Sequence, residues 1–538
     1  MRQRAQWGQA SVEKMLGALP VVAGFCSRLR IRELVDAACP VRDVAELTHG
    51  QVIEVLVANR LTSPTPLVHV QDWAERWAVD EAFGVEPGLL NDDRIGRALD
   101  ALAPHLDQVA GSVGLAAIEA FGIEVARLHW DMTSISLHGD YDDAEPGYAT
   151  PRFGHPKDRR PDLKQIQAGL AVSADGAIPV FHRAYDGAAG EVAQVIGAMQ
   201  ALQRLAGPQQ VLMVGDSKLI SYANLAAMIA DGVSFIAPAS KVFVSAETLA
   251  ELDLATASEV DYVAARDEGK SADRRGVWHV TEDAMTLAGP RKKDPILTMR
   301  RIFVHSSARA QAAATARAKK LDRARDDLAR LERGLGSRHY PTEQAVADRL
   351  AAIGRDRRVS AYLTAATGTD PSTGKPTLSW HFDQNAIDTE AATDGWYALL
   401  TNLPPESADA AQVLRHYKGQ EAVERRYQAF KGPLAVTHLY LKNNRRIHAL
   451  ITVICLALLI FCLIERQVRQ ALAARGQAKI GGLYAGRPAV PTGRLILDAL
   501  AGIRLIPGTG QSPPVIPQPT DLQLHLLDLL DTDPRDLR

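Results

Sequence analysis

Cysteine is scarce in this 538-residue sequence, which holds only Cys26, Cys39, Cys455 and Cys462. No two of them stand in a Cys-x2-Cys pair, the spacing typical of zinc sites. Four cysteines in a chain of this length also imply no disulfide framework. We therefore expect neither a zinc site nor stabilising disulfides, and the composition suits a reducing cytoplasm.

A strong excess of charge of one sign is also missing, since the formal net charge is −2 and the sequence pI is about 6.7. A nucleic-acid-binding chain without global basicity must meet the phosphates through local basic patches. The sequence has no glycine-rich phosphate-binding loop and no internal repeat. We therefore expect no nucleotide cofactor and no repeat architecture.

Long hydrophobic runs are limited to one, ALITVICLALLIFCLI at Ala449–Ile464. Its sixteen residues fall short of the roughly 20 that span a bilayer, so we interpret it as a buried core helix rather than a membrane span. At the other end of the sequence, Arg2, Arg4 and Trp7 are not followed by the compact apolar run of a signal peptide. These features predict a cytoplasmic protein.

The length predicts more than one domain, at about 100–200 residues per domain. Residues 1–120 have the pattern of a helical domain: Thr48–Leu61 and Asn91–Leu102 show helical periodicity and begin with capping residues. Trp73 and Trp77 stand four apart, as on a buried helix face. Binding of DNA ends, dimerisation and a helix bundle without a DNA role all remain open for this domain.

From residue 121 to residue 240 the pattern changes to that of an α/β domain. The expected order is strand, two hairpin strands joined at Asp175-Gly176, helix, strand, helix and strand. The corresponding ranges are 125–137, 165–173, 177–183, 191–205, 210–214, 221–230 and 233–238. Asp131 lies in the first strand, and Asp216 follows the strand 210–214. If these two strands are parallel neighbours, their carboxylates meet.

A domain inserted at 241–405 is expected, because a crossover connection needs far fewer residues than the 207 between Asp216 and Glu424. Within it, the charged helix Ala308–Leu335 has leucines at heptad spacing. This spacing favours a helical hairpin or short coiled coil over direct contact with nucleic acid. Strands are expected at 359–367, 377–382 and 396–401.

The stretch Asp409–Lys431 predicts one long helix, with Asp409 as N-cap, Gln412 at capping-box spacing, and Gly432-Pro433 as the stop. Steps of three and four residues place a set of polar side chains on one face. This set is Tyr417, Gln420, Glu424, Tyr427 or Gln428, and Lys431. A solvated charged face is the alternative interpretation.

Three carboxylates that converge at strand ends and on a helix suit hard divalent cations, and Mg²⁺ in particular prefers oxygen ligands. Two such ions can stabilise both the attacking and the leaving oxygen of an in-line phosphoryl displacement. The order Asp131, Asp216, Glu424, each on a suitable element, therefore predicts phosphoryl-transfer chemistry.

The spacing Tyr417-x2-Gln420-x3-Glu424-x6-Lys431 resembles the Y-x2-R-x3-E-x6-K signature of the DDE transposases encoded by bacterial insertion sequences. Four further stretches resemble blocks of one branch of that family, and the resemblance runs from about residue 25 to residue 470. They are HWDMTSISLHGDY around Asp131, HPKDRRPDLKQ (155–165), VGDSKLIS (214–221) and PLAVTHLYLKNNRRIHALI (433–451).

This resemblance implies an RNase H-like catalytic core, with pieces at 121–240 and 406–475, interrupted by the insertion domain and preceded by the helical domain. Residues 476–538 are expected to form a Gly/Pro-rich, loop-like region that ends in a helix at 521–530. Asp131, Asp216 and Glu424 would be the catalytic residues and hold Mg²⁺, with Mn²⁺ as a substitute. The reaction would be cleavage at the transposon ends followed by strand transfer.

The same resemblance assigns Tyr417 and Lys431 to phosphates of the terminal DNA. Gln420 stands where the signature has arginine, and a neutral amide cannot make the bidentate phosphate contact. Either Lys418, Arg425 or Arg426 compensates for this change, or the copy is weakened. The basic block 155–165 adds Lys157 and Arg160 as DNA-contact candidates.

Some relatives with this signature stack a flipped base on an inserted aromatic residue. Trp278 is a candidate for that role in this chain, although core packing is the simpler interpretation of a tryptophan at this position.

Three functions remain open: an active transposase, a non-catalytic DNA-binding relative, and a nuclease of the same fold. The expected partner is double-stranded DNA, both transposon ends and target. Action on two DNA ends implies at least a dimer. The expected location is the bacterial cytoplasm, in association with the nucleoid. No membrane and no small-molecule substrate is expected.

Overall fold

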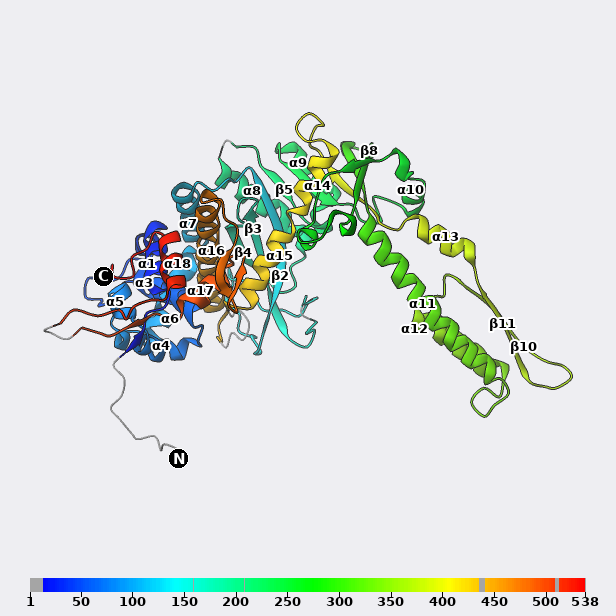
Figure 1. Cartoon of the computed structure of the whole chain (residues 1–538), viewed down its shortest axis with the longest axis horizontal. Coiled ribbons are helices and arrows are strands. Elements are labelled where there is room, and N and C mark those ends of the chain that lie inside the picture. Colours follow the sequence, from blue (N-terminus) through cyan, green and yellow to red (C-terminus); the bar gives the residue numbers. More distant parts are fainter. Residues whose placement is uncertain (1–12, 158, 208, 435–440, 509–511, 538) are drawn as a thin grey trace. The chain divides into compact units, whose positions relative to one another are not determined.

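The computed structural model describes residues 13–157, 159–207, 209–434, 441–508 and 512–537 (Figure 1). The chain forms two compact units. Residues 235–418 form the second unit, and the chain before and after them forms the first. The second unit includes the range 241–405 predicted for an insertion domain and extends beyond both of its ends, and residues 13–120 and 476–537, where described, belong to the first unit.

The sheet of the first unit carries its strands in the order β4-β3-β2-β5. β3 pairs antiparallel with both β2 and β4, and β5 pairs parallel with β2. The bounds are β2 (Arg127–Leu137), β3 (Lys164–Ser173), β4 (Pro179–Tyr185) and β5 (Leu212–Val214). The predicted hairpin turn at Asp175-Gly176 is confirmed, and Gly176 has a φ of 77°, which a residue without Cβ adopts without strain.

Two helices flank β5 in sequence, α8 (Glu191–Ala206) before it and α9 (Tyr222–Ala230) after it, close to the predicted ranges. The strand predicted at 233–238 is also present, as β6 (Ser234–Pro238). It pairs antiparallel with β12 (Trp396–Thr401), and the predicted strand is confirmed.

The N-terminal part of the first unit is helical, as predicted. Its helices are α1 (Leu19–Arg28), α2 (Ile31–Ala38), α3 (His49–Thr62), α4 (Val70–Arg76), α5 (Val79–Phe83), α6 (Asp92–Leu102) and α7 (Leu106–Phe121). Thr48 caps α3 in a capping box with Gln51, and Asn91 caps α6, which confirms both predicted helix starts. Trp73 is 1% exposed and packs against Trp77, with ring centroids 6.0 Å apart.

The apolar run at 449–464 lies inside α16 (Asn444–Ala474), which is almost twice as long as the predicted helix. By length and composition α16 could cross a membrane, but 94% of its apolar window is buried within the protein. It packs against α3, α6, α7 and β4, which is the position of a core helix. The core-helix interpretation is therefore the one that the packing supports.

The C-terminal region differs from the loop predicted over 476–519. It contains a hairpin, β13 (Ile480–Tyr484) with β14 (Arg487–Ala489), and a helix, α17 (Gly493–Leu500). A short strand, β15 (Arg504–Leu505), pairs with β1 (Lys14–Met15) near the other end of the chain. The terminal helix α18 (Asp521–Leu529) is confirmed.

The sheet of the second unit has the order β6-β12-β9-β8-β7, with β7 (Ser258–Val260), β8 (Trp278–Leu287) and β9 (Leu297–Ser306). A helical hairpin, α11 (Ser307–Arg333) and α12 (Glu343–Arg357), follows it. Leu321, Leu328 and Leu331 of α11 are buried against Val346 and Ile353 of α12, which confirms the predicted hairpin. The remaining elements are α10 (Ala246–Ala250), the hairpin β10 (Leu363–Thr369) with β11 (Pro376–Phe382), and α13 (Gln384–Ala392).

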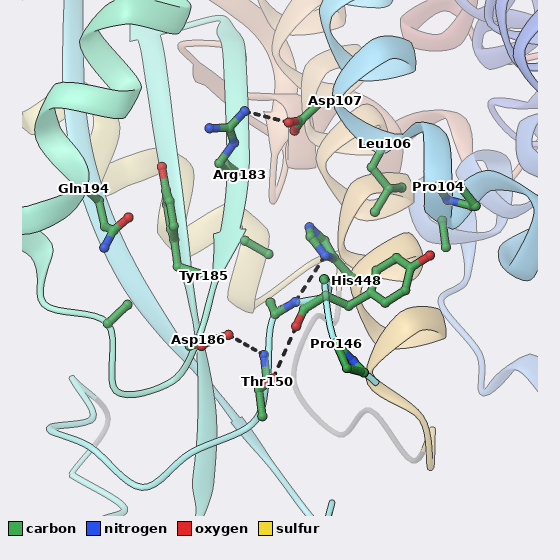
Figure 2. Close-up of a pocket in the computed structure, with 16 residues that line it drawn as sticks. Pro104, Leu106, Asp107, Pro146, Thr150, Arg183, Tyr185, Asp186, Gln194 and His448 are labelled. Carbon is green, nitrogen blue, oxygen red and sulfur yellow. Dashed lines mark hydrogen bonds and ion pairs between the residues drawn. The ribbon is translucent and has the colours of Figure 1, made fainter. Parts of the chain in front are cut away.

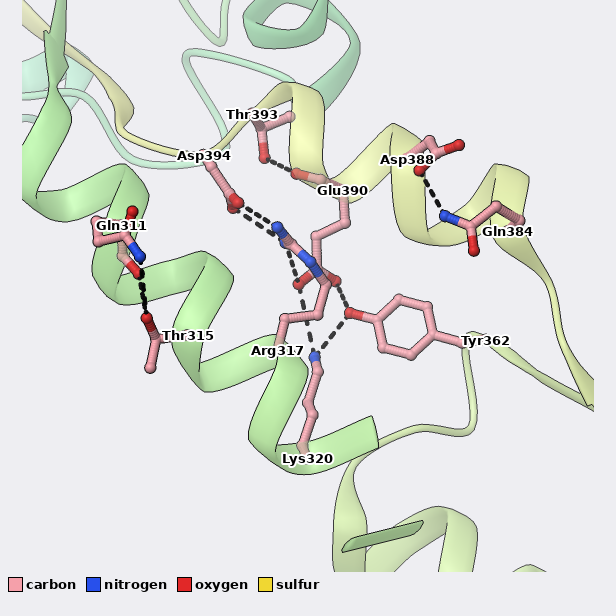
Figure 3. Close-up of polar contacts among 10 residues, drawn as sticks. All are labelled: Gln311, Thr315, Arg317, Lys320, Tyr362, Gln384, Asp388, Glu390, Thr393 and Asp394. Atoms are coloured by element: carbon pink, nitrogen blue, oxygen red, sulfur yellow. Dashed lines mark hydrogen bonds and ion pairs between the residues drawn. The ribbon is translucent and has the colours of Figure 1, made fainter. Parts of the chain in front are cut away.

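A polar cluster ties α11 to the segment around α13 within the second unit (Figure 3). Arg317 is paired with Asp394 and, at 3.5 Å, with Glu390, while Lys320 donates to the Tyr362 hydroxyl at 2.7 Å. Arg317 is only 7% exposed, so its charge is met by these carboxylates rather than by water. The basic residues in this part of the charged helix therefore stabilise the unit itself.

The stretch Asp409–Lys431 forms two helices, α14 (Ala410–Lys418) and α15 (Glu421–Lys431), instead of the predicted one. The predicted start is confirmed, since Asp409 and Gln412 exchange hydrogen bonds of 2.7 and 2.9 Å. The break falls at Gly419-Gln420, where glycine is a poor helix former. Gly432 ends α15 as predicted. The extended segment predicted at 439–441 falls mainly on residues 439–440, which lie outside the described residues.

Candidate functional site

Two of the three predicted carboxylates lie side by side in the first unit. β2 and β5 are parallel neighbours, with His129 opposite Val214 in the register. Asp131 and Asp216 each follow these positions by two residues, so they come next to each other where the pairing ends. The expectation that the two strands are adjacent and parallel is confirmed.

The Asp131 carboxylate is held in an environment that favours its neutral form. Its side chain is 14% exposed, and burial raises its pKa to about 6, with the charge of Asp216 adding to the rise. The Lys157 ammonium, 3.2 Å from Oδ1, and the Met132 N–H, at 2.8 Å, oppose this shift without cancelling it. A buried carboxylate beside a second carboxylate is a position that favours a bound cation.

Lys157 fills that position with its own ammonium. Besides Asp131, it contacts the Met132 carbonyl oxygen and lies 3.6 Å from the Glu191 carboxylate. Burial alone would lower the lysine pKa, but the carboxylates of Asp131 and Glu191 hold it above its usual value. The structure thus places Lys157 on the carboxylates themselves, whereas the sequence proposed it as a DNA contact.

Glu191, the first residue of α8, is the residue at this site that sequence reasoning missed. An acidic residue in the first turn of a helix is ordinary, because it complements the helix dipole. Position alone therefore gave no signal that Glu191 belongs with Asp131. The antiparallel hairpin β3-β4, which leads the chain into α8, brings the two together.

The third predicted carboxylate, Glu424, is exposed on α15, a helix bonded to β2 at two points. The Gln420 amide donates to the Trp130 carbonyl oxygen at 3.0 Å, and the Tyr427 hydroxyl donates to the Asp131 carbonyl oxygen at 2.6 Å. At about 100° per residue, positions 420, 424, 427 and 431 fall within a stripe of about 60°. Glu424 therefore stands on the side of α15 that follows β2 past Asp131.

Tyr417 does not share this stripe. It lies on α14 in the second unit, half-buried, with its ring centroid 6.4 Å from that of Tyr397. The predicted continuous face from Tyr417 to Lys431 is wrong, because the turn at Gly419 interrupts the helical phase.

Gln420 is 8% exposed and uses both ends of its amide within the protein. Its Nε2 donates to Trp130, and its Oε1 lies 3.2 Å from Nδ1 of the buried His129. The DNA contact predicted for Gln420 is therefore replaced by a structural one. Gln420 stands where the signature has arginine, and its amide hydrogen-bonds the start of α15 to β2.

Replacing Gln420 by alanine is expected to destabilise the first unit by about 1–3 kcal/mol, because the Trp130 carbonyl and the His129 ring lose a buried partner. Chemical denaturation would measure this change. Gln428→Ala, on an exposed position of the same helix, is the matched control and should change stability by less than about 0.5 kcal/mol. Equal effects of the two substitutions would contradict the role assigned to Gln420.

The remaining predicted DNA contacts are Arg160, Arg425 and Lys431. Arg160 is exposed and pairs with Asp162 at 2.7 Å. Arg425 is exposed on α15, one residue after Glu424, and Lys431 is half-buried at the end of the same helix.

Trp278 is 4% exposed, and the Lys418 ammonium lies 4.2 Å from its ring centroid. The edge of Tyr262 also packs on this ring, at a centroid distance of 5.6 Å. Core packing is therefore what the structure gives Trp278, and a base has no free ring face to stack on there.

Among the residues that the structure describes, no three side chains of histidine, cysteine, aspartate or glutamate lie close enough together to hold a metal ion. The donor chemistry nevertheless fits a hard divalent cation, because Asp131, Asp216 and Glu424 offer only carboxylate oxygens. A cation, the Lys157 ammonium, already lies against Asp131. Asp131 and Asp216 could hold the ion, and the side chain of Glu424 would turn toward them to complete the set.

A cavity of about 820 Å³ lies at the edge strand β4, away from these carboxylates (Figure 2). Its charged lining groups are paired with each other or with the backbone: Arg183 with Asp107 at 2.6 Å, and Asp186 with the Thr150 N–H at 2.7 Å. Burial lowers the pKa of His448, which accepts from the Ala149 N–H at 3.5 Å. None of the predicted site residues lines this cavity.

The similarity of this chain to known proteins is limited. Residues 11–107 match the model of a domain of unknown function, DUF4277. No curated protein matches the sequence. The solved structures similar to this chain include a piggyBac transposase synaptic complex with hairpin DNA, at 8% identity and a TM-score of 0.37, covering 90% of this chain and 78% of that one. They also include a Mos1 transposase paired-end complex with the left transposon end, at 11% identity and a TM-score of 0.14, covering 36% of this chain and 60% of that one.

Proposed function

We propose that this protein is a DNA transposase of the DDE type, which binds the terminal inverted repeats of an insertion sequence and catalyses Mg²⁺-dependent cleavage and strand transfer. The observation that carries the proposal is the placement of Asp131 and Asp216 next to each other, where the parallel pairing of β2 with β5 ends. The helix that bears Glu424 is hydrogen-bonded to the first of these strands on both sides of that residue.

Asp131, Asp216 and Glu424 would hold Mg²⁺, which supplies activation of the attacking oxygen and neutralises charge on the leaving oxygen. Gln420 and Tyr427 position Glu424 by fixing α15 to β2. Lys157 offsets the repulsion among the carboxylates before an ion binds, which keeps Asp131 and Glu191 close together. Lys431, at the end of the same helix, would contact a DNA phosphate as a point charge, and Tyr417 would add a hydrogen bond.

The partner is double-stranded DNA, both the transposon ends and the target. Because two ends are joined in one reaction, the working form is at least a dimer. A location in the bacterial cytoplasm, with access to the nucleoid, belongs to the same proposal. The RNase H-like core is also part of it, with residues 235–418 as the inserted domain.

The proposal is tested by incubating the full-length chain and Mg²⁺ with DNA that carries the inverted repeats flanking its own gene. The wild-type protein should cleave at the repeat ends and join them to a target. Glu424→Gln should remove both products while end binding persists, because the substitution removes one anionic ligand and keeps the side-chain shape.

The alternatives give different results in this assay. Cleavage without joining, and without a need for two cognate ends, would indicate a nuclease of the same fold. Specific end binding with no cleavage by the wild-type protein would indicate a non-catalytic DNA-binding relative. Glu421→Gln, an exposed carboxylate on the same helix, is the matched control and should retain both products.

A further inference from the structure

A cavity of about 520 Å³ lies beside α15 in the first unit. Four arginines line it, but only one carboxylate does. These residues come from α15, α16 and α17: Arg425, Arg426, Arg469, Arg494 and Glu465.

The floor of this cavity is a buried ion pair. The side chains of Arg426 and Glu465 are 9% and 7% exposed and lie 3.2 Å apart. Arg426 also donates to the carbonyl oxygens of Gly176 and Ala177, at 2.6 and 3.0 Å. Because this pair is neutral as a unit, the charge that faces the cavity comes from the other three arginines.

Those three arginines are not fully neutralised. Arg469 shares Glu465 with Arg426, at 3.1 Å, and Arg494 lies 3.5 Å from Asp498 on the exposed side of α17. Arg425 is exposed, and no carboxylate of the described residues lies within 4.0 Å of it. Burial lowers the pKa of Arg469, Glu465 opposes this, and repulsion from Arg426 and Arg425 lowers it further. The cavity therefore holds more guanidinium groups than the carboxylates around it can neutralise.

We infer that this cavity, the arginine pocket, binds a backbone phosphate of the DNA on which the proposed function acts. Planar guanidinium groups match the oxygens of a phosphate and bind it in a bidentate way. At about 100° per residue, the residues of α15 that line the pocket are centred near Ala429, on the side of the helix away from the stripe of Glu424, so the pocket would meet a part of the DNA other than the bond that is cut. The inference rests on the proposed function, because that function supplies the DNA strand.

The test measures binding of the full-length protein to a labelled duplex that carries the inverted repeats, between about 50 and 200 mM salt. The double variant Arg425→Gln/Arg494→Gln should bind about tenfold more weakly, and its log–log salt slope should fall by about one unit. Arg475→Gln is the control, because Arg475 is a similarly exposed arginine with one surface partner, Asp528, and does not line the pocket. Arg494→Gln alone, at a side chain that is 70% exposed, is a second variant that should retain the fold and weaken binding in the same direction.

The outcomes separate this inference from the proposed function. If the wild-type protein cleaves and joins DNA while the double variant keeps the wild-type affinity and salt slope, the arginine pocket does not bind a DNA phosphate. If the wild-type protein binds no DNA, the proposed function fails, and melting curves with tripolyphosphate then decide. A rise in melting temperature that the double variant lacks supports a phosphate site in the arginine pocket, and equal shifts overturn it.

Discussion

Asp131→Asn is expected to reduce DNA cleavage by at least about a thousandfold, because removing an anionic metal ligand removes several kcal/mol of transition-state stabilisation. Binding of the DNA ends should persist, since the proposed role of Asp131 is to bind the metal ion and not a DNA phosphate. A cleavage assay and a binding assay on the same duplex measure the two effects. Cleavage by the variant at the wild-type rate would remove Asp131 from the catalytic site.

The same substitution is expected to stabilise the protein. Burial raises the pKa of Asp131 in the folded state from its usual value near 3.8 to about 6, so the native state binds the proton more tightly than the unfolded state does. Protonated Asp131 therefore adds to the free energy of unfolding below about pH 4, and this contribution is lost as the pH rises through about 6. At pH 7 the free energy of unfolding is lower by about 3 kcal/mol than it would be with Asp131 protonated, because a pKa difference of one corresponds to about 1.4 kcal/mol.

Melting temperatures of the wild-type protein and the variant should therefore agree near pH 4 and diverge above pH 6, with Asp131→Asn the more stable. Asp142→Asn, at an 81% exposed carboxylate that pairs with Lys164, is the matched control for cleavage and should leave it intact. A variant that is less stable than the wild-type protein at pH 7 would contradict the pKa assigned to Asp131.

Glu465→Gln is expected to destabilise the first unit by about 3–5 kcal/mol, because it leaves the buried Arg426 charge without its partner. Glu465 also accepts a hydrogen bond of 2.9 Å from the Gly493 N–H at the start of α17 and pairs with Arg469 at 3.1 Å. The carboxylate therefore joins three helices, and α15 among them carries Glu424. We expect cleavage to fall together with stability.

Chemical denaturation, followed by circular dichroism, measures this change. Asp528→Asn is the control: it breaks a pair with Arg475 in which the two side chains are 63% and 44% exposed, and exposed pairs contribute about 0–1 kcal/mol. The double variant Arg426→Met/Glu465→Leu should recover much of the loss, because it removes both buried charges. A loss for Glu465→Gln no larger than that for Asp528→Asn would contradict the buried-pair interpretation.

Local sequence signals predicted the elements that carry the site. The apolar strand before Asp216, the strand around Asp131, the turn at Asp175-Gly176 and the cap at Asp409 are each decided by neighbouring residues, and each is present in the structure. The parallel pairing of β2 with β5 was only a condition at the level of sequence, because two hairpin strands separate β2 from the helix and strand that follow, and the structure meets that condition.

What sequence reasoning missed depends on long-range contacts. Gln420 looked like a weakened phosphate contact because its partners, His129 and Trp130, lie about 290 residues away in the sequence. The Lys157–Glu191 contact joins a loop to a helix start in the same way. The sequence predicts a loop at 480–500 because this stretch is rich in glycine and proline, although packing on α16 orders α17.

The most direct test of the carboxylate site is a structure of the full-length protein with DNA ends and Mn²⁺, in which anomalous scattering locates the ion. We predict an ion whose anomalous peak lies about 2.0–2.2 Å from carboxylate oxygens of Asp131, Asp216 and Glu424. The Lys157 ammonium should be displaced from Asp131. A complex competent for cleavage in which the ion lies elsewhere, or in which Glu424 points away from Asp131 and Asp216, would contradict the proposed mechanism.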